Sequence, residues 1–293
     1  MAGFVAPDVL VLAAGGVVGE AWMTGVLAGV EDASGLDLGR VESFVGTSAG
    51  AIVAARLAGG KRLRRPPGRR AGAERLEEGD GGGGLVRTAA RWGWAATAPL
   101  APLATAVAAP GGALLRSALL ARAPSSGQTH AYLRREVSAW GARFDGRLRV
   151  CCVDRRSGRR VVFGAPGAPA ASVADAVVAS CAIPWVFAPV RIGGREYVDG
   201  GIWSVTNLDA APAGRDTQVL CLEPTAALRS IVRQAFRVAA AVELQILRTR
   251  GARVRRVIPD QAATEAMGPH FMAPATAPAA LRAGYRQGHA LAA

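Results

Sequence analysis

The chain has few of the residues that usually supply a catalytic base or a metal site. It contains three histidines and four cysteines in 293 residues. The cysteines lie at positions 151, 152, 181 and 221, without a C-x-x-C spacing, and the neighbouring pair would face opposite sides of a strand. This pattern predicts neither a zinc site nor a disulfide framework. We expect buried free thiols and a reducing, cytoplasmic location, with no bound metal.

Lysine is almost absent, yet the chain is strongly basic. Lys61 is the one lysine among 35 basic residues, and the formal net charge is +13. Such a charge favours anionic partners, either nucleic acid or an anionic membrane surface. The basic run "KRLRRPPGRR" begins at Lys61 and has no interleaved aromatic residues, so nucleic acid is not expected. The run is interpreted as a solvated linker, with contact to anionic lipid as the alternative.

The sequence also lacks an unbroken apolar run of membrane-spanning length. The longest uncharged segment, 92–115, contains three prolines and three glycines, so a spanning helix is not expected there. The N-terminus has no basic n-region and carries Asp8 within its apolar run, which favours a first strand over a signal peptide. These features predict a cytoplasmic protein that can bind peripherally at the inner membrane surface.

The periodicity of the first 58 residues is typical of an α/β fold. An apolar strand (8–13), a glycine turn (15–19), a helix (20–33), a second strand (41–46) and a second helix (48–58) follow one another. This order predicts a mostly parallel central sheet flanked by helices.

Later segments extend the same pattern within a single domain, 1–293. They predict paired strands (147–154 and 159–164), a helix (172–182), strands (194–201 and 217–224), a helix (about 226–250) and a strand (253–260). A flexible basic and glycine-rich insertion is expected at 60–84, followed by a helical, Pro/Ala-rich, lid-like region at 85–145. Arg229, Arg233 and Arg237 form a basic stripe interpreted as a solvent face.

A G-x-S-x-G pattern lies between the second strand and the second helix. It runs from Gly46 to Gly50 and places Ser48 at the turn. A serine on such a turn projects near a helix N-terminus, where negative charge is stabilised. The pattern therefore indicates either a nucleophile or a small-residue packing turn, and the pentapeptide alone does not separate the two.

Two glycine-rich segments flank this serine along the chain. Gly15, Gly16 and Val17 follow the first strand, ahead of Gly19, and their backbone amides are suited to an oxyanion hole. A dinucleotide site is not expected, because the spacing is irregular and the candidate acidic residue, Asp37, is poorly placed. No cofactor is therefore predicted.

An aspartate with little steric cover ends the strand "REYV". Asp199 is followed by Gly200 and Gly201, so its carboxylate can approach another backbone segment closely. Alone, this is a common turn.

The segments "AAGGVVGEAWMTGVL", "GTSAGAIVA", "ASCAIPWVFAPV" and "VDGGIWSVTNLDAA" occur in that order. Together they resemble the patatin-like phospholipase family. The resemblance implies a three-layer patatin-like fold and a serine lipid acyl hydrolase, with Ser48 as nucleophile, Asp199 as base and the glycine loop as oxyanion hole. Ala14 and Val18 stand where the family has a glycine and a basic residue, which puts the rigidity of the loop in doubt.

Several alternatives remain open at this stage. An α/β-hydrolase triad would add His270 or His289 to the serine and aspartate, although His270 lies in a Pro/Ala-rich stretch (267–280) that is typical of a loop. His130 is interpreted as a surface residue at a helix start. A non-catalytic lipid-binding protein and an acyltransferase are also compatible with the motifs. The segment 85–115 is expected to dock on lipid, which binding to anionic vesicles at low salt would test.

Overall fold

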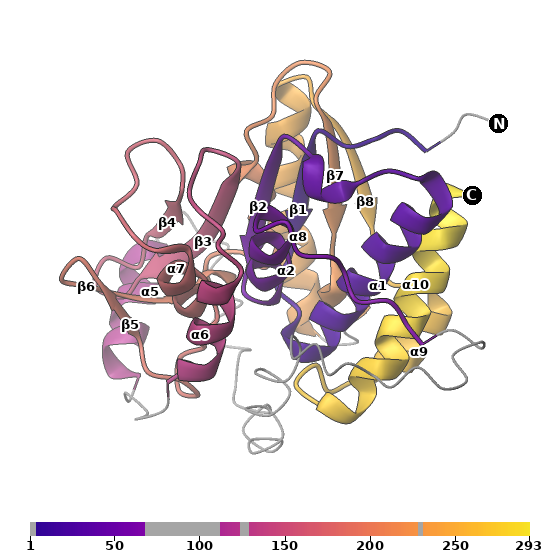
Figure 1. The fold of residues 1–293 in the computed structure, drawn as a ribbon. Coiled ribbons are helices and arrows are strands. Elements are labelled where there is room, and N and C mark those ends of the chain that lie inside the picture. The colour runs from indigo at the N-terminus through magenta and orange to yellow at the C-terminus, as the bar shows by residue number, and fades with distance from the viewer. Residues whose placement is uncertain (1–3, 68–111, 124–128, 228–230) are drawn as a thin grey trace.

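The described residues fold around one mixed sheet of eight strands, whose arrangement is shown in Figure 1. A computed structural model describes residues 4–67, 112–123, 129–227 and 231–293. The strand order is β5-β6-β3-β2-β1-β7-β8, with β4 paired to β3 outside this path. The strands are β1 (Val9–Leu12), β2 (Ser43–Thr47), β3 (Leu148–Asp154), β4 (Arg160–Phe163), β5 (Val190–Ile192), β6 (Arg195–Asp199), β7 (Gln218–Leu222) and β8 (Arg253–Val257).

Helices cover both faces of the sheet, which gives three layers. The α-helices in the described residues are α1 (Gly16–Ser34), α2 (Ala49–Ala58), α5 (Gly112–Arg122), α6 (Ala131–Ala139), α7 (Val173–Ser180), α8 (Ile231–Thr249), α9 (Gln261–Met267) and α10 (Ala277–Ala292). Along β1, Leu10 and Leu12 join the core formed with α1, α2, α7 and α10, whereas Val9 and Val11 join the core formed with α8. This alternation follows from the two-residue period of a strand. The predicted α/β fold with helices flanking a central sheet is confirmed.

The sheet is parallel in one half and antiparallel in the other. β1 pairs in parallel with β2 and β7, and the parallel ladder continues to β3 on one side and β8 on the other. β4, β5 and β6 form the antiparallel half, where β3 pairs with both β4 and β6. The carboxyl ends of the parallel strands therefore open toward one edge, where ligands of such sheets usually bind.

Helices α1 and α10 pack at unusually close range, and Figure 1 shows them side by side. A methyl group on Gly25 or Gly29 of α1 would lie 2.2 Å from the carbonyl oxygen of Leu281 or Tyr285, respectively. Glycines of α10 make the reciprocal approach to α1: a methyl on Gly284 would lie 2.3 Å from the Trp22 carbonyl oxygen. The two helices therefore touch backbone to backbone, which fixes the position of α1.

Several elements differ from the sequence-based prediction. α1 begins at Gly16, so the predicted turn 15–19 is mostly the first turn of the helix. The stretch 267–280, predicted as a loop, is irregular or 3-10 only from residue 268 to 276, because α9 ends at Met267 and α10 begins at Ala277. β5, α9 and α10 were not predicted.

Some predicted features lie wholly or partly outside the described residues. The structure does not describe 68–111, which contains most of the predicted insertion (60–84) and of the segment 85–115. Of the predicted basic stripe, only the Arg237 side chain is described, and it is exposed. No helix in the described ranges combines the length and apolar content needed to cross a bilayer.

Candidate active site

Ser48 lies at a sharp turn between β2 and α2. Its backbone has φ 53° and ψ −121°, a conformation that a residue with a side chain rarely adopts. Strain of this kind gathers at functional sites and needs support from the surrounding structure. Ser48 is buried and forms the N-terminal boundary of α2, so its side chain lies beside the free amides of a helix start.

The two glycines of the G-x-S-x-G motif are required by packing. A methyl group on Gly50 would lie 1.9 Å from the Leu12 carbonyl oxygen, and one on Gly46 would lie 2.4 Å from the Ala51 Cα atom. Both distances are far below van der Waals contact. The turn can therefore bring α2 against β1 only because both positions lack a Cβ atom.

Ser180 is a site residue that the sequence analysis did not identify. The Ser48 amide donates to the Ser180 hydroxyl oxygen at 2.8 Å, and that hydroxyl donates to the Cys151 carbonyl oxygen at 2.7 Å. Ser180 is fully buried at the end of α7. It ties the strained turn to β3. Its place in the segment "ASCAIPWVFAPV" was the only available signal.

Asp199 reaches Ser48 because two strands converge on one edge of β3. Thr47 at the end of β2 lies opposite Cys151, and Asp199 at the end of β6 lies opposite Cys152. β4 occupies the other edge of β3, since it pairs with residues 150–153. β2 and β6 therefore run toward each other along the same edge, and their ends meet there. Ser48 and Asp199, which are separated by 151 positions in the chain, thereby become neighbours.

The Asp199 carboxyl is buried, and its hydrogen bonds offset the cost of burying its charge only in part. Burial raises its pKa from 3.8 to about 6, while hydrogen bonds from the Gly201 amide and the Ser48 hydroxyl act to lower it. The Gly201 amide donates to the Asp199 Oδ1 atom at 2.7 Å. The backbone at Gly200 lies close against β3, and only glycine fits there, because a methyl at Gly200 would lie 2.2 Å from the Cys151 carbonyl oxygen. The pKa of this carboxyl is therefore about 6, within about one unit of neutral pH.

The start of α1 presents unpaired backbone amides. Within the described residues, no acceptor is found for the amides of Gly15, Gly16 or Val17. The Val18 amide donates to the Phe271 carbonyl oxygen, and the Gly19 amide donates to the Gly15 carbonyl oxygen. A helix N-terminus with free amides favours an anion or a developing oxyanion.

The structure explains how the altered glycine loop is accommodated. Gly16 has φ +58°, and a methyl on it would lie 2.7 Å from the Phe271 carbonyl oxygen. The Val18 side chain is fully buried in the main core. Ala14 is held by its amide, which donates to the Val205 carbonyl oxygen at 2.8 Å. Neighbouring backbone and core packing therefore fix the loop without a basic side chain at position 18.

The three histidines occupy different environments. His130, predicted to lie on the surface, is buried instead: it lines a small cavity with Ser48, Gly16 and Met272. Its ring packs on Phe187 at a centroid distance of 3.8 Å. His130 does start a helix, α6. The surface assignment was wrong because the ring finds a polar partner inside the protein.

In the described part of the chain, none of these histidines forms a hydrogen bond with Asp199. The His130 Nε2 atom lies 3.0 Å from the Cys181 carbonyl oxygen, which assigns the proton to Nε2. Burial lowers the pKa of His130 to about 4, so its ring is neutral at physiological pH. His270 is exposed in the loop before η6 (Pro274–Thr276), and His289 lies in the last turn of α10.

Comparison with solved structures finds similar chains, among them those of VipD and ExoU. The crystal structure of VipD from Legionella pneumophila has 16% sequence identity and a TM-score of 0.47, covering 99% of this chain and 67% of VipD. The crystal structure of the type III effector protein ExoU has 19% identity and a TM-score of 0.35, covering 98% of this chain and 54% of ExoU. This chain therefore spans about half the length of ExoU. No curated protein matches it in a sequence comparison.

Comparison with protein families gives a more direct result. The family model described as patatin-like phospholipase matches residues 10–212, which contain Ser48, Asp199 and the glycine loop. The match covers more than half of the chain and confirms the resemblance inferred from the motifs. The chain belongs to the patatin-like phospholipase family, and its general class is that of a lipid acyl hydrolase.

Proposed function

We propose that this protein is a serine carboxylic ester hydrolase of the phospholipase A, lysophospholipase or carboxylesterase type that uses a Ser48–Asp199 dyad. The observation that carries the proposal is the convergence of β2 and β6 on one edge of β3, with Asp199 opposite Cys152 and Thr47 opposite Cys151. The proposal is further supported by the strained backbone of Ser48 and the burial of the Asp199 carboxyl.

In the proposed reaction, the Ser48 hydroxyl oxygen attacks the carbonyl carbon of an acyl ester while the Asp199 carboxylate takes the hydroxyl proton. The amides of Gly15, Gly16 and Val17 bind the oxyanion of the tetrahedral intermediate. Collapse of the intermediate breaks the bond to the alcohol oxygen, which receives the proton from Asp199. The result is an acyl-enzyme on Ser48 and a free alcohol.

A second addition completes the proposed cycle. Water attacks the acyl-enzyme carbonyl carbon and gives a proton to Asp199, and the proton then returns to Ser48 as the carboxylic acid leaves. A carboxylate is a weak base toward an alcohol. The proposal is supported by the raised pKa of Asp199 and by unpaired amides at the α1 N-terminus, because both lower the barrier to alkoxide formation.

The dyad is favoured over a Ser-Asp-His triad by the surroundings of the three histidines. A triad histidine must bridge the nucleophile and the acid. His130 instead bonds the Cys181 carbonyl oxygen, while His270 and His289 are exposed. The Asp199 Oδ1 atom accepts from the Gly201 amide, and its pKa is influenced by the Ser48 hydroxyl.

A fluorophosphonate probe tests the proposed nucleophile directly. We expect the wild-type protein to gain one covalent adduct, located on the Ser48 peptide by mass spectrometry, and the Ser48→Ala variant to gain none. Ser138→Ala, which changes an exposed serine of α6, serves as the matched control and should label like the wild type. A folded wild-type protein that does not react would contradict the proposal and favour a non-catalytic lipid-binding role.

A further inference from the structure

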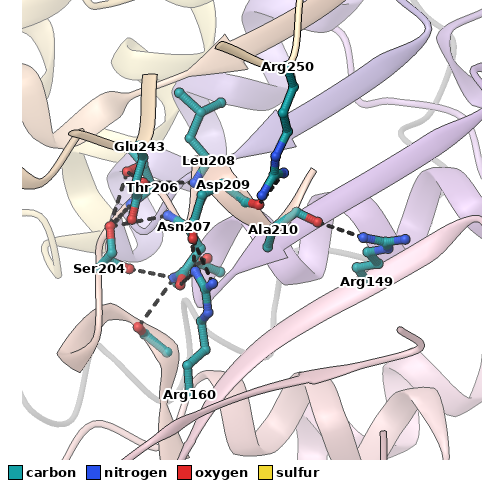
Figure 2. Close-up of polar contacts among 12 residues, drawn as sticks. Arg149, Arg160, Ser204, Thr206, Asn207, Leu208, Asp209, Ala210, Glu243 and Arg250 are labelled. Atoms are coloured by element: carbon teal, nitrogen blue, oxygen red, sulfur yellow. Dashed lines mark hydrogen bonds and ion pairs between the residues drawn. The ribbon is translucent and has the colours of Figure 1, made fainter. Parts of the chain in front are cut away.

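The segment after Asp199 folds into a compact buried turn, residues 204–208, shown in Figure 2 with its polar contacts. Asn207 is fully buried there and has φ 48°, a left-handed conformation that asparagine tolerates better than most residues. The Ser204 hydroxyl oxygen accepts from the amides of Thr206 and Asn207. The turn is thus organised by its own side chains.

The Asn207 carboxamide connects the two chain segments that carry the proposed dyad. Its Nδ2 atom lies 3.1 Å from the Thr47 hydroxyl oxygen and 3.4 Å from the Gly200 carbonyl oxygen. Thr47 directly precedes Ser48, and Gly200 directly follows Asp199. The same Nδ2 atom donates to the Ser204 carbonyl oxygen at 2.6 Å. A displacement of Asn207 would therefore disturb both ends of the dyad.

Glu243 of α8 forms hydrogen bonds to this turn (Figure 2). Its Oε2 atom accepts from the Thr206 hydroxyl at 2.5 Å and from the Leu208 amide at 2.8 Å. These two donors lie immediately before and after Asn207. One carboxylate oxygen therefore fixes both flanks of the residue that joins Thr47 to Gly200.

Burying the Glu243 carboxylate has an energetic cost that hydrogen bonds from this turn partly offset. The side chain is buried, and burial together with the charge of Asp209 raises its pKa. Among the described residues, no Lys or Arg forms an ion pair with it. Its charge is held by neutral donors, chiefly those of the turn. A buried carboxylate with this donor set is sensitive to small displacements.

We propose that Glu243 is a positioning residue for the Ser48–Asp199 dyad, acting through the 204–208 turn and the Asn207 carboxamide. This inference rests on the proposed function. Glu243 lies outside residues 10–212, so it is not part of the segment that matches the family model. Helix α8 thereby becomes part of the catalytic architecture, although it contributes no group to the reacting atoms.

A double-mutant cycle between Glu243 and Asn207 tests the inference on a water-soluble short-chain ester. Glu243→Met removes the acceptor while keeping the length of the side chain, and we expect kcat to fall by about 10- to 100-fold with KM within about twofold. Asn207→Ala should lower kcat by about 100-fold. The double variant should match Asn207→Ala within about threefold, because both changes break one chain of contacts.

Two control variants separate positioning from general destabilisation. Glu243→Gln keeps an acceptor oxygen and should restore kcat to within about threefold of the wild type. Asp154→Leu removes a different buried carboxylate, which accepts from the Ser157 amide, and should lower the Tm without lowering kcat. If Asn207→Ala does not fold, Thr206→Val replaces it in the cycle, since it removes the hydroxyl donor to Glu243.

The outcomes distinguish the inference from the proposed function. Turnover by the wild type that Ser48→Ala abolishes supports the proposed function alone. The inference is overturned if Glu243→Met then keeps wild-type kcat, or if the losses in kcat from Glu243→Met and Asn207→Ala multiply in the double variant. Absence of wild-type turnover and of Ser48 labelling would overturn both.

Discussion

Asp199 carries a burial cost that depends on pH. Its pKa is raised from 3.8 to about 6, mainly because burial disfavours the charged carboxylate. Between these values, the unfolded chain loses the proton while the folded chain keeps it. Stability from this group is therefore fully present below about pH 3.8 and is lost as the pH rises through about 6, by on the order of 3 kcal/mol.

Asp199→Asn should remove this pH dependence. The amide stays neutral and keeps an oxygen that can accept from the Gly201 amide. We expect the variant to gain stability relative to wild type as the pH rises from 4 to 8, measured as the Tm difference in calorimetric scans. Glu265→Gln, at a helix position outside the site, serves as the control. A Tm difference for Asp199→Asn that stays constant over this range would contradict the assigned burial cost.

Single residues differed in how far the sequence revealed them. Ser48 and Asp199 could be chosen as candidates because glycines beside each mark a tight turn. Ser180 and Asn207 could not be chosen, because their roles consist of hydrogen bonds to partners far away in the sequence. The separation is 132 positions for Ser180 and 160 positions for Asn207. His130 was misassigned because a polar residue at a helix start is usually solvated, whereas Phe187 and the Cys181 carbonyl enclose it here.

Among the elements, α1 depends most on a partner distant in sequence. Its first turn forms the candidate oxyanion loop, and α10 holds it through glycine contacts on both helices. Trp22 of α1 contacts α10 further, because its Nε1 atom donates to the Gln287 Oε1 atom at 2.9 Å. The C-terminal helix therefore helps to place a loop near the other end of the chain.

Gly29→Ala should destabilise the protein, although alanine normally favours a helix by about 1 kcal/mol. The added methyl would lie 2.2 Å from the Tyr285 carbonyl oxygen and 2.7 Å from the His289 nitrogen, so α10 must move. We expect a loss of on the order of 1–3 kcal/mol, read as a lower Tm. Gly214→Ala, whose methyl meets nothing within 4 Å, should leave the Tm close to wild type. A Gly29→Ala Tm equal to or above wild type would refute close contact between the helices.

Two of the elements that the sequence failed to predict, α10 and β5, were missed for separate physical reasons. α10 carries Gly284 and Gly288, which lower helix propensity but permit the approach to α1. β5 is a three-residue strand joined to β6 through Gly193 and Gly194, too short for a periodic signal. β1, β2, β3 and β7 were predicted because their apolar runs are buried in the sheet, whereas β8 is mostly exposed.

At the scale of the whole molecule, the candidate site arises where the two halves of the sheet join. The parallel half supplies Ser48 at the end of β2, and the antiparallel half supplies Asp199 at the end of β6. Motif order indicated that both belong to one site, but the direction and edge of β6 were not in the sequence pattern. In the proposed dyad, this convergence of β2 and β6 is what brings the serine and the aspartate together without a histidine between them.

The measurement that tests this account most directly is turnover of a short-chain chromogenic ester by three variants of the full chain. We predict that Ser48→Ala and Asp199→Asn each lose at least about 10²-fold in kcat/KM, the scale of a lost general base, while His270→Ala stays within about twofold of wild type. Circular dichroism should show all three variants folded. A collapse of activity in His270→Ala, or near-normal activity in Asp199→Asn, would contradict the dyad.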